Sequence, residues 1–216
     1  MWAIEAIKRL FTVPDNPELV LAQARALSRQ VPLMYAMLLV NTLVLSATHV
    51  GTAPAIFTIY TPAILCIASV LRIIAWWRSH DALQDVAKAR RSLSRMMQVM
   101  PFLAIAFSIW AIALLPYGDP YQRSQVVFFS GITTIGCMFC LMHVRAAAIT
   151  MGGLALFPFT VVMLMTGNTV LVAIAINLVA VVAAMLIILL GNYRDFAALV
   201  ESRRNMSKLI WVFIFR

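Results

Sequence analysis

Two cysteines, a methionine and a histidine lie close together in segment 136–143, and their side chains could carry chemistry. Cys137 and Cys140 are three residues apart, so on a helix they are neighbours on one face. Met142 follows Cys140 closely, and His143 follows it after one turn. Thiolate, thioether and imidazole groups are the ligands that a soft metal such as Cu(I) prefers. The segment is therefore a candidate copper site or redox site.

The same residues have a structural interpretation, which is the stronger of the two. Cys and Met within an apolar run behave as small or adaptable hydrophobic side chains. His143 would then form a hydrogen bond at the membrane interface. A disulfide between Cys137 and Cys140 has poor geometry within one continuous helix. We therefore expect packing rather than a bound cofactor.

Two asparagines, Asn41 and Asn177, lie near the middle of apolar runs. Hydrogen bonds between helices are their expected role, and a small polar ligand pocket is the alternative. No Asp, Glu or Lys lies inside any apolar run, although ion-coupled transporters and retinal proteins need such groups. This pattern argues against both classes. Arg72 lies near the end of its run and is expected to extend toward the interface.

The last apolar run ends at a polar step formed by Asn192, Tyr193, Arg194 and Asp195. A polar segment with helix-forming composition follows it. If the run crosses a membrane, these four residues mark its exit. They are the predicted point at which a signal would leave the membrane.

Composition places the whole chain in a membrane. Of the 216 residues, 63% are hydrophobic and only 12% are charged, whereas soluble domains carry about 25% charged residues. About six spans of roughly 20 residues use up this length. No room remains for a soluble catalytic domain, and no phosphate-binding loop or catalytic triad is present. We expect a non-enzymatic chain that does not bind nucleic acid.

The predicted fold is all-α, with six transmembrane helices. Segment 1–30 forms cytoplasmic amphipathic helices, with Asn16 as an N-cap and Pro17 in the first turn. The membrane domain covers 31–191, and an exit helix with an apolar tail covers 192–216. Pro62 and Pro158 are expected to kink their spans. The six spans are 31–50, 54–77, 96–115, 125–143, 146–166 and 169–191.

Charge predicts the orientation of these spans. With the N-terminus inside, every Lys and Arg of the 17 except Arg123 falls on the cytoplasmic side. Positive residues concentrate on that side of membrane proteins, where they also meet anionic lipids. Both termini are therefore predicted to be cytoplasmic, in the inner membrane of a bacterium.

Five stretches together resemble a known family. They are 24–35, which leads into the first span, 71–78, 116–119, 137–143 and 192–196. In this order they are similar to the N-terminal membrane region of bacterial GGDEF and GGDEF–EAL proteins, which make and degrade cyclic di-GMP. The similarity covers about residues 16–206. It implies a sensory bundle whose exit helix relays a signal to a cytoplasmic catalytic domain, often in a dimer.

The chain departs from that family where the catalytic domain would begin. It has no Gly-Gly-Asp-Glu-Phe and no Glu-Ala-Leu signature, and residues 207–216 are apolar and aromatic. The function expected from the resemblance is a sensory or regulatory membrane module that lacks its output domain and forms a homodimer. The alternative from a different class is a small transporter or channel-like protein. A passive anchor or a truncated product is a third interpretation.

Overall fold

The structure, a computed structural model, describes residues 16–79 and 85–214. These residues are almost entirely helical and include no strand, which confirms the all-α prediction. The amphipathic helix predicted within residues 1–13 lies outside the described part of the chain. The elements are α2 (Pro17–His49), η1 (Ile56–Tyr60), α3 (Thr61–Ser79), α4 (Val86–Leu114), α5 (Pro120–Cys140), α6 (Arg145–Met165) and α7 (Thr169–Ile214).

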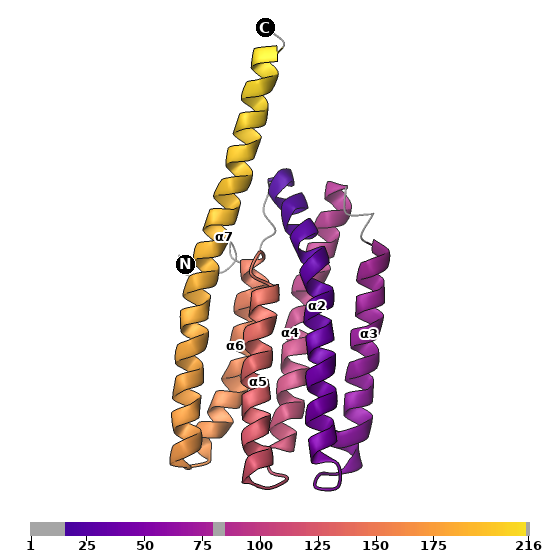
Figure 1. Ribbon diagram of the computed structural model, residues 1–216, viewed down its shortest axis with the longest axis vertical. Coiled ribbons are helices and arrows are strands. Elements are labelled where there is room, and N and C mark those ends of the chain that lie inside the picture. The colour runs from indigo at the N-terminus through magenta and orange to yellow at the C-terminus, as the bar shows by residue number, and fades with distance from the viewer. Residues whose placement is uncertain (1–15, 80–84, 215–216) are drawn as a thin grey trace, which may run out of the picture.

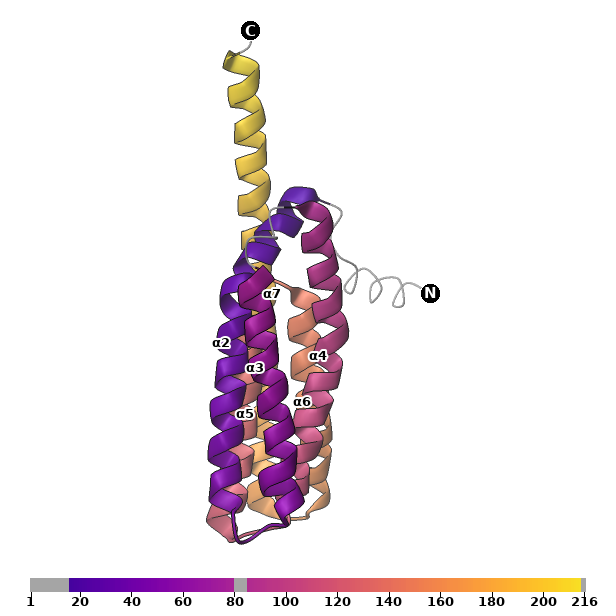
Figure 2. The same cartoon turned by 90° about the vertical axis from the view of Figure 1, so that its right-hand side faces the viewer.

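The helices run alternately up and down in an elongated bundle (Figures 1 and 2). Helix α2 packs against α3, α4 and α5, while α6 packs against α4, α5 and α7. The turns that follow α2, α4 and α6 lie at one end of the bundle. The second half of α7 projects beyond the other end, which we call the exit end.

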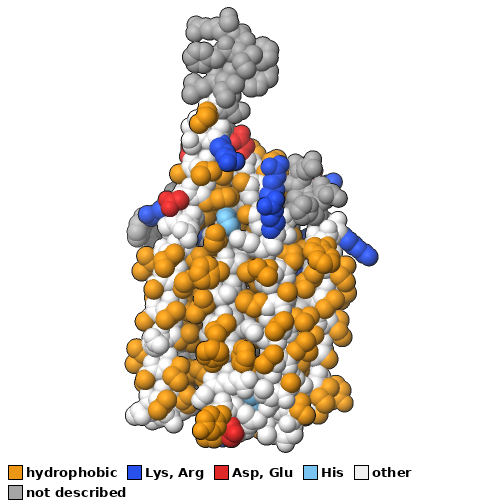
Figure 3. Space-filling view, viewed as in Figure 1, with side chains coloured by type: hydrophobic (Ala, Val, Ile, Leu, Met, Phe, Trp, Pro, Cys, Tyr) orange, Lys and Arg blue, Asp and Glu red, His pale blue; other side chains and the backbone are white. Residues whose placement is uncertain are grey.

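Five helices of the described chain are long and apolar enough to cross a membrane, so the chain is a multi-pass membrane protein. They are Pro17–His49, Ile56–Arg78, Val86–Leu114, Arg145–Met165 and Thr169–Arg203. Figure 3 shows apolar side chains over the face of the bundle, with Lys and Arg gathered at the exit end. The predicted fourth span corresponds to α5, which is not among the five. Ser, Thr, Gln and Gly residues interrupt its apolar run, so it has no 18-residue stretch as apolar as those of the five.

Several boundaries differ from those expected. The predicted N-terminal helix and first span form one 33-residue helix, α2, which starts at the predicted cap: Asn16 Oδ1 accepts the Glu18 N–H at 3.1 Å. Helix α4 begins at Val86, well before the expected span, and α5 ends at Cys140 rather than at residue 143. The polar step at 192–195 does not interrupt α7, which continues for 46 residues.

The second span begins with a turn of π-helix, η1, directly before Pro62. Because proline has no N–H, Pro62 leaves the Thr58 carbonyl without its usual helical donor. The N–H of Thr61 bonds to the Ile56 carbonyl, five residues back, so the Phe57 carbonyl is also free. The structure therefore has a π turn next to Pro62, while the kink expected there stays a prediction. Pro158 lies inside α6 without interrupting it.

Neighbouring helices bond both freed carbonyls. The Ser46 hydroxyl on α2 donates to the Thr58 carbonyl, and the Trp110 indole Nε1 on α4 donates to the Phe57 carbonyl at 2.8 Å. A backbone group left unbonded in hydrocarbon costs several kcal/mol. The π turn therefore fixes α3 against α2 and α4.

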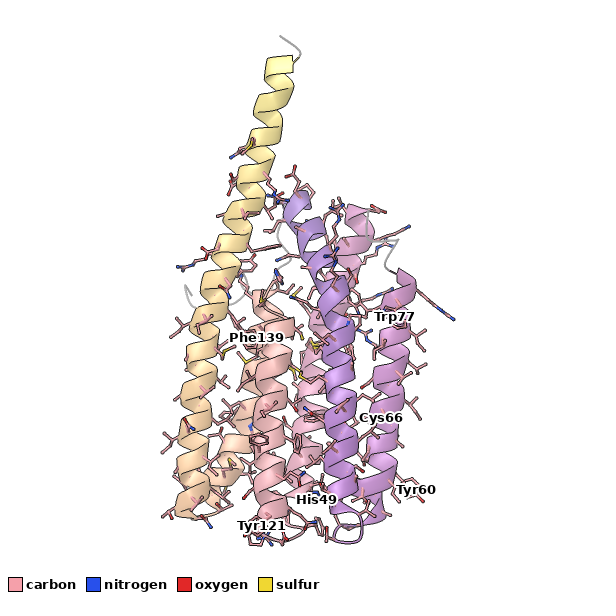
Figure 4. The ribbon with its side chains drawn as sticks, viewed as in Figure 1. His49, Tyr60, Cys66, Trp77, Tyr121 and Phe139 are labelled. Carbon is pink, nitrogen blue, oxygen red and sulfur yellow. The ribbon has the colours of Figure 1, made fainter. Side chains whose placement is uncertain are left out.

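His49 lies near this junction, at the end of the bundle opposite the exit (Figure 4). Its ring is fully buried, and its Nδ1 is 3.0 Å from the Leu45 carbonyl. Its Nε2 has no hydrogen-bond partner among the described residues. His49 therefore combines packing and a hydrogen bond through Nδ1 with one unsatisfied polar atom, Nε2.

This junction predicts effects of different size for two substitutions. Trp110→Phe removes the donor to the Phe57 carbonyl and should destabilise the bundle by about 1–3 kcal/mol, because a buried acceptor is left unpaired. His49→Phe keeps an aromatic ring and removes the unsatisfied Nε2, but it also removes the Nδ1 contact with the Leu45 carbonyl, so it should destabilise the bundle less than Trp110→Phe does. Unfolding in mixed micelles measures both free energies. Equal destabilisation by the two variants would contradict the assignment.

Candidate functional site at the α5–α6 turn

The turn between α5 and α6, residues 141–144, brings two predicted sites together. Because α5 ends at Cys140, His143 lies in this turn rather than in a helix. Its ring contacts the Phe196 ring on α7 edge-on, with 4.7 Å between the ring centroids. The predicted Cys/His segment and the predicted exit stretch are thus neighbours in space.

His143 also bonds to α2 through two glutamines. Its Nδ1 lies 3.0 Å from Gln30 Oε1, and because an amide oxygen only accepts, Nδ1 carries the proton. Its backbone carbonyl accepts from Gln23 Nε2 at 2.9 Å. Gln23 is only 2% exposed, so this bond is shielded from water and lipid. The turn is therefore attached to α2 on one side and to α7 on the other.

A second contact lies one turn along α7. The Arg145 guanidinium carbon, at the start of α6, lies 5.3 Å from the centre of the Tyr193 ring. A cation over an aromatic face is attractive by about 0.5–1 kcal/mol or more. Tyr193 and Phe196 are three residues apart and lie on one face of α7. We call Gln30, His143, Arg145, Tyr193 and Phe196 the exit clamp.

The predicted exit residues divide between two faces of α7. Tyr193 is half-buried in the exit clamp, whereas Asn192, Arg194 and Asp195 are exposed. The exposed residues leave a polar surface free where the helix emerges. Tyr193 contacts Arg145 of the bundle and so holds the helix, while the other three side chains remain accessible.

The two cysteines of the candidate site differ in burial. Cys137 is fully buried and Cys140 is half-buried, and both are free thiols. Met142 packs against the hydrophobic core. In the part of the chain that the structure describes, no three His, Cys, Asp or Glu side chains group to hold a metal ion. The ring of His143 is oriented toward Gln30 and Phe196.

The two intramembrane asparagines have different environments. Asn41 on α2 is buried and donates to the Thr133 hydroxyl on α5, which confirms the expected hydrogen bond between helices. Asn177 on α7 is exposed and lines a groove of about 180 Å³ between α5 and α7. Among the described residues it has no hydrogen-bond partner. The structural role expected for Asn177 is therefore not provided within one chain.

Sequence reasoning missed three members of this site, Gln23, Gln30 and Arg145. The glutamines lie on the buried face of the helix that leads into the membrane, where a polar side chain needs a partner. That burial requirement is the signal that could have identified them. Comparisons with known proteins add nothing further: no protein-family model, curated protein or solved structure matches the chain.

The ring contact predicts how firmly α7 is held. Phe196→Ala removes the edge-on contact with His143, which is worth about 0.5–1.5 kcal/mol. Backbone amides over 192–206 should then exchange with deuterium about 5-fold faster. Leu199→Ala is the matched control, because Leu199 is 55% exposed on the same helix. Equal rates for wild type and Phe196→Ala would show that this contact does not hold the helix.

The clamp is also predicted to weaken in acid. Burial lowers the pKa of the His143 imidazole below its ordinary value of about 6.5. Release of the clamp exposes the ring and restores that value, so the released state binds more protons at acidic pH. The clamp is therefore stable above pH about 6.5 and weakens as the pH falls through the lowered pKa.

Spin labels at the exposed positions 29 and 199 measure this effect, in a background without the native cysteines. Their distance distribution should broaden below pH about 6.5 in the wild type. His143→Phe keeps an aromatic ring but cannot bind a proton, so its distribution should not change with pH. Identical pH responses in both proteins would assign the effect to another group.

Proposed function

We propose that this chain is a sensory or regulatory membrane module that relays rearrangements of its helix bundle through α7 into the cytoplasm. The observation that carries the proposal is the continuity of α7. It begins at the end opposite the exit, crosses the bundle and projects beyond it as one 46-residue helix (Figure 1). A straight helix of that length spans about 69 Å at 1.5 Å per residue.

A continuous helix can act as a lever because its ends move together. The membrane part of α7 is loosely covered by the other helices, which supports this role. Only 11% of its most apolar 18-residue stretch is buried, against 44% of the corresponding stretch of α2. Few contacts resist movement of α7 inside the bundle. The exit clamp holds the helix at Tyr193 and Phe196. A shift of α2 or of the α5–α6 turn would therefore change the direction or rotation of the projecting half.

We further propose six spans, with α5 as the additional one. Its 21 residues match the length needed to cross the hydrocarbon layer. It lies alongside the others in the bundle. Thr133 and Thr134 on α5 are buried, so its less apolar residues face neighbouring helices rather than lipid. Six spans with the exit end inside would place both termini in the cytoplasm of a bacterial inner membrane, in agreement with the distribution of Lys and Arg.

A homodimer is part of the proposal. Ala173, Asn177, Ala180, Ala184 and Gly191 share the exposed face of α7 at heptad-like spacing. Small residues allow close approach of helices, and an amide in hydrocarbon gains a hydrogen bond by pairing with its copy. Asn177 lacks a partner among the described residues of its own chain. A second copy related by two-fold symmetry would supply one.

The output named by the resemblance, synthesis of cyclic di-GMP by a GGDEF domain, supplies a direct test. Residues 1–206 are fused to a diguanylate cyclase domain, and one to seven residues are inserted after Val200. If α7 passes on its rotation, activity should vary with the helical period of 3.6 residues and return near seven inserted residues. The cyclase needs cytoplasmic GTP, so activity also requires the exit end to be inside.

Phe196→Ala in this fusion should change cyclase activity, whereas Leu199→Ala should not. An inactive cyclase variant controls for background. If cyclase activity changed neither with the number of inserted residues nor with Phe196→Ala, the relay would be contradicted. Flux of a small solute through proteoliposomes of the unfused chain would instead favour the transporter or channel alternative.

A further inference from the structure

Arg72 is a charged side chain within the apolar length of α3. It lies six residues before Arg78, which corresponds to about 9 Å along the helix. Trp77, which is 72% exposed, lies between them toward the exit end (Figure 4). The neighbouring residues Leu71 and Ile74 are exposed apolar side chains that face lipid. Arg72 therefore lies deeper than the tryptophan at the membrane interface.

Tyr35 on α2 holds the guanidinium of Arg72. Arg72 Nε donates to the Tyr35 hydroxyl at 3.3 Å, and the guanidinium carbon lies 5.8 Å from the centre of the ring. Tyr35 is only 1% exposed, so packing fixes the position of its ring. A guanidinium has five N–H donors. In the described chain Tyr35 takes one of them, and the others have no protein acceptor.

The described chain also offers this cation no counter-charge. The eight acidic residues of the sequence are Glu5, Asp15, Glu18, Asp81, Asp85, Asp119, Asp195 and Glu201. None of them lies within the apolar length of a helix, and no described one contacts Arg72. An arginine remains charged even when buried, and a charge without a partner in hydrocarbon is costly. The missing anion must therefore come from outside the described protein.

We propose that Arg72 and Tyr35 form a binding site for the phosphate group of a phospholipid in the leaflet at the exit end. The planar fork of arginine matches two phosphate oxygens, which makes this pair stronger than a single charged contact. Tyr35 orients the fork by holding Nε, so the terminal nitrogens remain for the lipid. Exposed apolar residues flank the site on α3 and would contact acyl chains, which favours a lipid over a free anion.

Native mass spectrometry of the full chain, released from mixed-lipid nanodiscs, tests the site. The probes are phosphatidylglycerol and a galactosyl diacylglycerol, which has similar chains but no phosphate. The wild type should retain phosphatidylglycerol in preference to the galactolipid. R72Q should weaken that retention by about tenfold, as expected for loss of a charge-assisted pair. R72K should give an intermediate loss, because it keeps the charge without the fork.

Arg78→Gln is the matched control, since Arg78 is an exposed cation at the end of the same helix. It should leave phosphatidylglycerol retention unchanged. Equal losses in R72Q and R78Q would overturn the proposal in favour of general surface charge. Equal retention by wild type and R72Q would overturn it outright, and R72K provides the same comparison if R72Q does not fold. Displacement of the lipid by millimolar inorganic phosphate would identify a free-anion site instead and would also contradict the proposal.

Discussion

Every backbone polar group within a hydrocarbon layer must find a partner inside the protein, and this requirement shapes the bundle. The helices meet it along most of their length. One exception is the start of the second span, where Pro62 and the π turn free two carbonyls. Ser46 and Trp110 bond them from two different helices. A local defect in one helix thereby becomes a fixed connection among three, because no solvent is available to replace either donor.

Helix α2 joins the two ends of the bundle. Near its C-terminal end, Ser46 bonds to the π turn and the Thr48 carbonyl accepts from Gln122 at the start of α5. Near its N-terminal end, Gln23 and Gln30 bond to His143. A continuous helix that is bonded at both ends can pass a displacement from one end of the bundle to the other, although Pro32 removes one backbone hydrogen bond within α2. The proposed relay therefore has a physical route from the far end of the bundle to the exit clamp, through hydrogen bonds rather than through lipid-facing packing.

The start of α2 and the order of the helices follow from local chemistry, and so they could be predicted. Asn16, Pro17 and long apolar runs act through their immediate neighbours. The environments of Asn41 and Asn177 could not be distinguished in this way, since both are amides in the middle of apolar runs. One faces Thr133 and the other faces outward because of how each helix is rotated in the bundle. The rotation of each helix about its axis depends on packing across the whole bundle. Because α7 is apolar on nearly every side, its sequence has no local pattern that determines this rotation.

The same limit applies to the exit stretch, where α7 continues through the polar step without interruption. Gly191 and the polar residues after it lower local helix propensity, but a single glycine costs only about 1 kcal/mol relative to alanine. Contacts of Tyr193 and Phe196 with the α5–α6 turn compensate for that cost. They come from residues distant in sequence, so no reading of 189–204 alone could reveal them. The polar atoms without partners, on Arg72 and Asn177, extend this reasoning beyond one chain. Arg72 is half-buried and Asn177 is exposed, so the lipid and a second copy are the natural sources of their partners.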